Sequence, residues 1–220
     1  MASASASPPS ERTIGVGTLW RRVALTTLLS WGPMVLLHAT TLAGLGPWSV
    51  QGVELFVLLV PLAGLGLFVA GFAVMLSSRW RDVALQVLVT CCVVLLTFVP
   101  AVWLSGWLRM RGFAWAGERA MPVVAAMERC FAATGAVPDT VEALVPQWLD
   151  RMPSRIPPLR VVTQDAADGY LGNNRWALMA DVPSGVINWD MFLYLPDRQY
   201  PARGWGGRLQ RLGNWAYVHE

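Results

Sequence analysis

The sequence has no lysine, few cysteines and histidines, and little charge for its length. Of its 220 residues, 14% are charged and 55% are hydrophobic, and its 17 basic residues are all arginines. A soluble globular domain usually has about 25% charged residues and about 45–50% apolar ones. The composition therefore excludes a fully soluble protein, a disordered chain and a disulfide-rich mini-protein.

The few charges are unevenly placed along the chain. Residues 23–108 carry four of them, Glu54, Arg79, Arg81 and Asp82, whereas the remaining 134 residues carry 27. This contrast predicts a membrane part and a water-facing part. The net charge of +3 does not indicate nucleic-acid binding, because residues 109–220 hold 12 arginines and 11 acids and lack the clustered cations that phosphates require.

The three cysteines exclude thiolate metal sites and an internal disulfide framework. Cys91 and Cys92 are adjacent inside an apolar run, and Cys130 is alone in the water-facing part. A structural metal site needs several cysteines or histidines at ligand spacing, which the sequence lacks. We expect no metal and no cofactor, although Cys130 could join two chains.

Three long apolar runs follow an N-terminal stretch rich in alanine, serine and proline. A bilayer core about 30 Å thick needs about 20 residues of helix, so the runs Val23–Gly44, Val53–Leu76 and Val83–Leu108 predict three membrane spans. Five tryptophans, whose rings prefer the headgroup level, fall near the predicted helix ends: Trp20, Trp48, Trp80, Trp103 and Trp107. The predicted organisation is a disordered cytoplasmic tail (1–22), three transmembrane helices (23–108) and an extracytoplasmic α+β domain (109–220).

The arginines that flank the spans predict the orientation of the chain, because cytoplasmic flanks carry an excess of basic residues. Arg12, Arg21 and Arg22 precede the first span and Arg79 and Arg81 follow the second, whereas the loop between the first two spans has no arginine. We expect the N-terminus in the cytoplasm of a bacterial inner membrane and the C-terminal domain in the periplasm or outside the cell. The alternative is a cleaved signal peptide, but the first run exceeds the 7–15 apolar residues of such a segment.

Two ionisable side chains fall within the predicted spans. His38 lies toward the outer end of the first span, and Glu54 opens the second. Ionisable residues inside a membrane are costly and are functional candidates, so His38 and Glu54 form a candidate intramembrane polar pair. The alternative leaves Glu54 at the water interface and His38 bonded to a neighbouring helix or to water. Small residues at Gly64, Gly66, Ala70 and Gly71 predict the second span as the packing centre of the three.

Residues 109–220 have the element order of an α+β domain. The helical spacing of Met121, Val124, Met127 and Phe131 predicts an amphipathic helix that ends at Gly135. Asp139 with Glu142 forms a capping pattern for a short second helix over 140–145. Prolines exclude further helix, and β-like runs follow at 159–163, 176–180, 191–195 and 215–219. We expect a small antiparallel sheet packed on the amphipathic helix.

The stretch 126–153, AMERCFAATGAVPDTVEALVPQWLDRMP, resembles the start of the type II secretion major-pseudopilin-like domain. That family runs a long helix into a G-x-x-P turn, then a short helix and a small sheet, and its work is protein contact. Here the turn begins at Gly135. Two departures matter: the Gly112-Phe113 pair follows the last span instead of preceding it, and Gly117 stands where prepilins carry Glu. We therefore expect neither prepilin processing nor fibre assembly, and we transfer no calcium ligands.

Groups that could act in catalysis are sparse. Ser184 with Asp181 and Asp190, or His219 with Glu220, could form partial sets, but no nucleophile elbow or metal spacing accompanies them. We interpret them as turn residues and a chain terminus, and we predict no catalytic site. The aromatic residues of the domain, Trp189, Trp205, Trp215, Tyr194, Tyr200 and Tyr217, are expected in the core, with an exposed binding groove as the alternative.

These features favour a membrane-anchored, non-enzymatic interaction module. Its expected partners are the lipid bilayer and another envelope protein or a second copy of the chain. The segment 203–208, rich in arginine, tryptophan and glycine, has the composition that binding surfaces favour. The alternative is a small membrane enzyme or transport accessory that uses His38 and Glu54.

Overall fold

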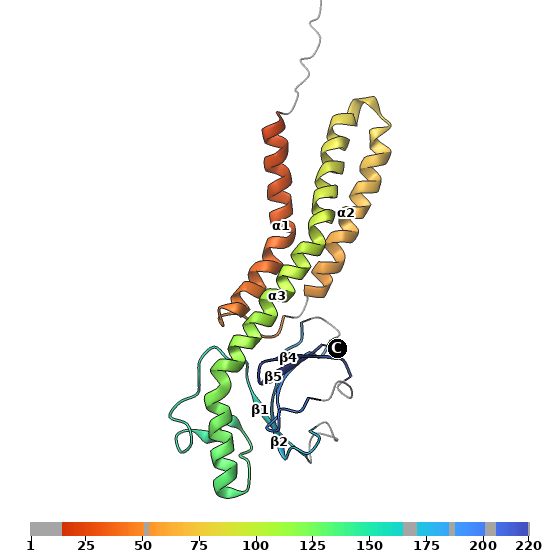
Figure 1. Ribbon diagram of the computed structural model, residues 1–220. Coiled ribbons are helices and arrows are strands. Elements are labelled where there is room, and N and C mark those ends of the chain that lie inside the picture. Colours follow the sequence, from red (N-terminus) through yellow and green to blue (C-terminus); the bar gives the residue numbers. More distant parts are fainter. Residues whose placement is uncertain (1–14, 51–52, 165–170, 185–187, 201–205, 220) are drawn as a thin grey trace, which may run out of the picture.

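The computed structural model describes residues 15–50, 53–164, 171–184, 188–200 and 206–219 (Figure 1). The helical elements are α1 (Val16–Leu42), α2 (Val53–Met75), η1 (Ser78–Trp80), α3 (Arg81–Thr134) and η2 (Val141–Leu144). The strands are β1 (Arg160–Thr163), β2 (Trp176–Asp181), β3 (Met191–Tyr194), β4 (Arg208–Leu212) and β5 (Trp215–His219).

Three helices in the described part of the chain are long and apolar enough to cross a membrane. This confirms the prediction of three apolar helices followed by a small antiparallel sheet. The first helix begins at Val16 rather than at Val23. Hydropathy marks only the apolar core of a span, whereas the hydrogen-bond ladder continues through good helix formers such as Arg21 and Arg22. Arg22 also donates to Gln86 of α3 at 3.4 Å.

Helix α3 runs without interruption from the anchor into the C-terminal domain (Figure 1). Its 54 residues span about 80 Å at 1.5 Å per residue, far more than the bilayer core of about 30 Å. The predicted third span and the predicted amphipathic helix are therefore two halves of one helix. The helix ends as predicted at Gly135, whose φ of 71° is the left-handed conformation that glycine adopts readily.

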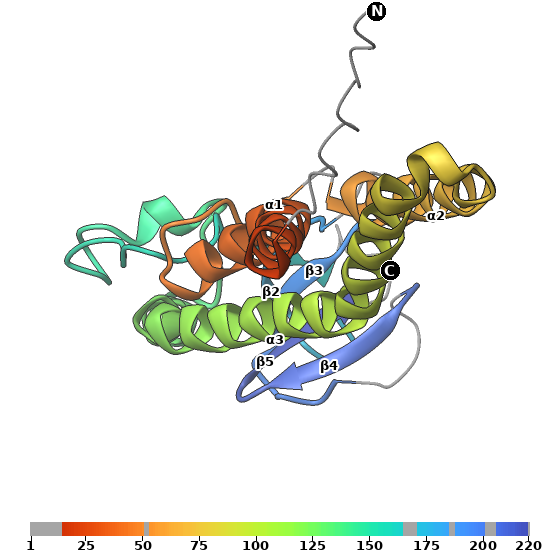
Figure 2. The ribbon, with the colours of Figure 1, turned by 90° about the horizontal axis from the view of Figure 1, so that it is seen from above.

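The three anchor helices are organised around α3. Both α1 and α2 pack against α3, and seen from above they lie apart from each other (Figure 2). The prediction of α2 as the packing centre is wrong, because its small residues do not share one face. A Cβ on Gly64 or Gly71 would contact a leucine of α3, whereas a Cβ on Gly66 would meet nothing within 4 Å.

The C-terminal half of α3 packs on a five-stranded antiparallel sheet of order β1-β2-β3-β5-β4. Alternate strand residues such as Leu178, Phe192 and Trp215 face α3 and pack with Phe113 and Met127. The residues between them form a second buried cluster on the opposite face of the sheet, with Ala177, Met179, Leu193, Leu195 and Val218 among its members. Both faces are thus covered, so the central strands are buried along nearly their whole length.

Two local predictions in this domain are corrected. The segment after Gly135 forms a single 3₁₀ turn at 141–144, and its N-cap is Thr140 without a side-chain cap hydrogen bond, so Asp139 does not cap it. Strand β4 was absent from the predicted set because its sequence, RLQRL, is rich in charge. It forms because the turn after it, with φ of 66° at Gly213, returns the chain as β5 alongside it.

Candidate functional site

Arg109 is a buried cation in α3, placed where the uncharged part of that helix ends. Its side chain is 3% exposed, and its guanidinium carbon lies 5.0 Å from the centroid of the Phe113 ring. Its Nε and Nη2 donate to the Tyr217 hydroxyl at 3.2 and 3.0 Å. Nη2 also donates to the carbonyl of Val182 at 2.6 Å and to that of Trp48 at 3.2 Å. This one side chain therefore joins the α1–α2 loop, α3 and the sheet.

Asp190 provides the acidic end of the same network and is 2% exposed. Its Oδ2 accepts from the Tyr217 hydroxyl at 2.7 Å and from Ser184 Oγ at 2.5 Å. Asn188 in turn donates to Ser184 Oγ at 2.8 Å. Tyr217 stands between Arg109 and Asp190, accepting from the cation and donating to the carboxylate. We call Arg109, Tyr217, Asp190 and Ser184 the Arg109 network.

Burial fixes the protonation of Tyr217 within this network. Removal from water raises the pKa of Tyr217 above its ordinary value, the nearby Arg109 charge acts in the opposite direction, and Asp190 raises it further. The phenol therefore remains protonated at neutral pH and keeps its donor for Asp190. The hydrogen bonds of this buried Arg–Tyr–Asp chain rigidify the junction between α3 and the sheet.

The Arg109 network borders a cavity of about 690 Å³ between the anchor helices and the sheet. We call it the junction cavity. The anchor contributes Met34, His38, Val57, Val102, Trp103, Ser105, Gly106 and Trp107 to its lining. The remaining lining residues are Arg109 and Met110 of α3 and, from the sheet side, Ser184, Asp190, Arg208, Gln210, Tyr217 and His219. One end of the cavity is thus mainly apolar and the other is polar and charged.

Both histidines of the chain line this cavity, although they lie 181 positions apart in sequence. His38 is 5% exposed and its Nδ1 is hydrogen-bonded to Ser105 Oγ of α3. His219 is hydrogen-bonded to Gln210 at 3.1 Å, and burial lowers the pKa of His219 below its ordinary value of 6.5. His38 thus bonds a neighbouring helix, which was the alternative weighed for it. Glu54 lies in the first turn of α2, but its side chain falls outside the described part, so the pair His38–Glu54 stays a prediction.

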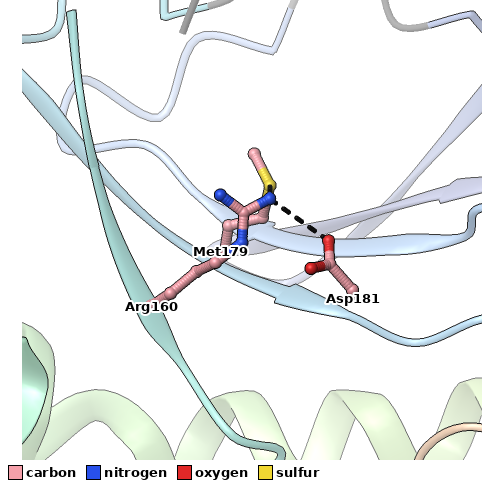
Figure 3. Close-up of polar contacts among 3 residues, drawn as sticks. All are labelled: Arg160, Met179 and Asp181. Carbon is pink, nitrogen blue, oxygen red and sulfur yellow. Dashed lines mark hydrogen bonds and ion pairs between the residues drawn. The ribbon is translucent and has the colours of Figure 1, made fainter. Parts of the chain in front are cut away.

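The residues considered for partial catalytic sets, which the sequence analysis interpreted as turn residues and a chain terminus, are only partly brought together. Ser184 and Asp190 are in contact, but Asp181 lies elsewhere, at the end of β2, where it pairs with Arg160 of β1 at 3.2 Å (Figure 3). Both partners of that ion pair are more than half exposed, so it contributes little stability. Glu220, the suggested partner of His219, lies outside the described residues.

The described side chains offer no arrangement for nucleophilic or metal-assisted chemistry. Within the described part of the chain, Ser184 has no hydrogen-bonded histidine to accept its proton, so the general base that activates a serine nucleophile is missing there. No group of three or more potential metal ligands is found among the described residues.

The aromatic residues divide between core and surface. Trp215, Tyr194 and Tyr217 are buried in the core, as predicted, and Tyr200 is partly buried against the other face of the sheet. Trp189 is 73% exposed, and Trp205, with the rest of 201–205, lies outside the described residues. Cys130 is a free thiol buried in the core cluster under α3.

Sequence reasoning missed Arg109 and the cavity beside it. An arginine directly after an apolar run is typical of a helix flank at the membrane surface. Nothing in its local sequence distinguishes Arg109 from Arg111, because its partners come from residues 48, 182 and 217. No protein-family model, curated protein or solved structure matches the chain.

Proposed function

We propose that the protein is a membrane-anchored, non-enzymatic interaction module that associates with another envelope protein or with a second copy of itself. The observation that carries the proposal is a groove of about 560 Å³ in the anchor, where α1 and α2 lie apart over α3. We call it the anchor groove. Residues from all three helices line it, and among the aliphatic and polar ones are small or hydroxyl-bearing side chains, including Thr26, Ser30, Gly64, Thr90 and Cys91.

Such a lining suits a partner's transmembrane helix. In a bilayer, helices associate where small residues let their backbones approach and where hydroxyl groups can hydrogen-bond across the interface. Exposed leucines of α1 outside the groove lining, Leu28 and Leu29, suit lipid contact.

The C-terminal domain is the second part of the proposed module. Its long helix, short helical turn and antiparallel sheet follow in the order of a pseudopilin-like domain, a lineage that works by protein contact. We place it in the periplasm or outside the cell, with the N-terminus in the cytoplasm of a bacterial inner membrane. The arginines around α1 and in the α2–α3 loop support this orientation.

Site-specific photo-crosslinking in native membranes tests the interaction. A photoreactive residue at Ser30, inside the anchor groove, should give crosslinks to protein, whereas one at the adjacent, 72% exposed Leu29 should label lipid. Replacing Thr26→Leu, which fills the groove, should remove the Ser30 crosslink. Equal protein crosslinking from Ser30 and Leu29 would contradict the proposal.

Phosphatase fusions test the orientation independently. A periplasm-dependent phosphatase fused after Glu220 should be active, and one inserted between Arg79 and Asp82 should be inactive. The opposite pattern would reverse the proposed orientation and would leave the proposed interaction at the anchor groove unaffected.

The alternative, a small membrane enzyme or transport accessory, has one observation in its favour. His38 lies buried inside the anchor and borders a cavity that reaches the polar domain. Under this alternative, His38→Ala and Glu54→Gln should abolish the cellular phenotype while expression and the Ser30 crosslink persist. Under the interaction proposal, those changes should leave the phenotype intact, and deletion of 112–220 should remove it.

A further inference from the structure

The junction cavity lies where the chain passes from an apolar to a polar environment. Along α3 its lining changes from Val102 and Trp103 to Arg109, the first charged residue of that helix after Asp82. Trp103 and Trp107 are exposed beside it, as indole rings at headgroup level are. The apolar end of the cavity therefore falls within the hydrocarbon region, and the polar end falls at the membrane surface.

The polar end carries a surplus of positive charge. Arg109 and Arg208 line it, and Asp190 is the one acid among the described lining residues. Asp190 already accepts hydrogen bonds from Tyr217 and Ser184. The two arginines and the one aspartate leave a net charge of +1 at this end of the cavity. An anionic group of a ligand would balance that charge.

Arg109 has one donor that the described residues leave without a partner. Its Nη1 is buried and has no hydrogen-bond partner in the described structure, although Nε and Nη2 are fully used. A buried guanidinium N–H without an acceptor is costly, and phosphate oxygens are among the acceptors that arginine binds best. Because Arg109 lines the cavity, an acceptor oxygen bound at this end would lie close to the guanidinium.

We infer that the junction cavity binds an anionic phospholipid, with the phosphate between Arg109 and Arg208 and an acyl chain along Met34, Val57 and Val102. The volume of about 690 Å³ suits a headgroup with the upper part of its chains. The apolar side chains of the lining favour a lipid over free phosphate, which would gain nothing from Val57 or Val102. This inference concerns a different site from the anchor groove and does not depend on the proposed function.

Photo-labelling of the full chain in vesicles tests the inference. The vesicles contain phosphatidylcholine with a minor share of phosphatidylglycerol that carries a photoreactive acyl chain, and the adducts are mapped by mass spectrometry. We expect adducts on α1 and α3 around Met34 and Val102, at a higher yield than with a photoreactive phosphatidylcholine. Equal yields from both probes, or adducts mapped elsewhere, would overturn the inference.

Two pairs of variants sharpen the test. Arg208→Gln should lower the adduct yield about fivefold, whereas Arg211→Gln, which removes the same charge from the other face of β4, should leave it unchanged. Gly106→Leu should also lower the yield, because a Cβ at Gly106 meets nothing within 4 Å and the side chain would fill the cavity. Its control is Gly66→Leu, where the space is equally open but lies outside the cavity. Equal yields within both pairs would contradict the inference.

A competition arm separates the two sources of the anion. Excess unlabelled phosphatidylglycerol should displace the probe, and excess inorganic phosphate should not. Displacement by inorganic phosphate alone would show that the site recognises free phosphate, which overturns the lipid assignment. If Arg208→Gln fails to give a protease-resistant domain, the Gly106→Leu pair decides the question by itself.

Discussion

The two halves of α3 contain similar apolar residues, but these side chains are exposed in one half and buried in the other. In the anchor half, large side chains such as Leu96 and Val99 are 77% and 69% exposed. In the domain half, Val123 and Met127 are fully buried against the sheet. The exposure of apolar side chains therefore changes along one helix, and the change falls close to Arg109.

This difference shows what holds each region together. The domain has buried clusters on both faces of its sheet, so burial of apolar surface from water stabilises it. Among the described residues of the anchor, the buried hydrophobic cluster is a small one around Trp31, Met34 and Val94. Since lipid tails are as apolar as leucine, the anchor depends on helix contacts and on the bilayer itself. The following predictions test this contrast, from the largest expected effect to the smallest.

A leucine-to-aspartate change should have opposite consequences in the two regions. Leu144→Asp places a charge at a position that is 0% exposed inside the core cluster, and we expect a loss of more than about 4 kcal/mol in the free energy of unfolding. The domain should then be degraded by a protease that the wild-type domain resists. Phe131→Asp should cost less, because Phe131 is only partly buried at the rim of the same cluster.

Leu96→Asp is the matched control in the anchor. The lipid-facing charge should cost about 2.5–3.5 kcal/mol for insertion into the membrane but should leave the domain protease-resistant in detergent. Protease sensitivity of the Leu96→Asp domain would mean that the two regions are not held by different forces.

Removal of Arg109 should affect the boundary between the regions. Arg109→Gln leaves the Val182 and Trp48 carbonyls without their donor and Asp190 without its nearby cation, which we expect to cost about 3–5 kcal/mol. In calorimetry, the unfolding transition of the domain should move to a lower temperature. Arg111→Gln removes the same charge two positions away and should leave the transition unchanged.

Glycine-to-alanine changes should be destabilising where helices pack closely and harmless where the glycine faces open space. A Cβ at Gly112 would lie 2.9 Å from the backbone of Thr41, which cannot give way, so Gly112→Ala should cost about 1–3 kcal/mol. Gly66→Ala in α2 meets open space and should be neutral or slightly stabilising. Thermal unfolding in the same detergent measures both, and equal midpoints would refute the close approach of α1 and α3.

The sequence predicts the elements of this molecule better than their connections. The three apolar helices, the end of α3 at Gly135 and strands near β1, β2, β3 and β5 follow from local periodicity. The continuity of α3 was missed because the change of solvent at Arg109 resembles an element boundary. The junction cavity could not be predicted, because its polar wall joins residues 109, 184, 190 and 219, which only the tertiary fold brings together.

Counted per tyrosine and per pH unit, the smallest predicted effect is the pH dependence of the domain, which holds all four tyrosines of the chain. Burial raises the pKa of Tyr194 and Tyr217, and it raises that of Tyr200 from 10.0 to about 12. Because the folded-state pKa lies above the unfolded one, their contribution is complete below pH 10 and is lost as pH rises beyond it. Each tyrosine should lower the free energy of unfolding by up to about 1.4 kcal/mol per pH unit in that range.

Tyr217→Phe should be less stable at neutral pH but should lose stability less steeply above pH 10, as measured by protease resistance. An unchanged slope would mean that Tyr217 titrates as freely in the folded domain as in the unfolded chain. Since the anchor has no tyrosine, its helical circular dichroism signal in detergent should persist through the same pH range. This measurement on the unaltered protein therefore distinguishes the two regions.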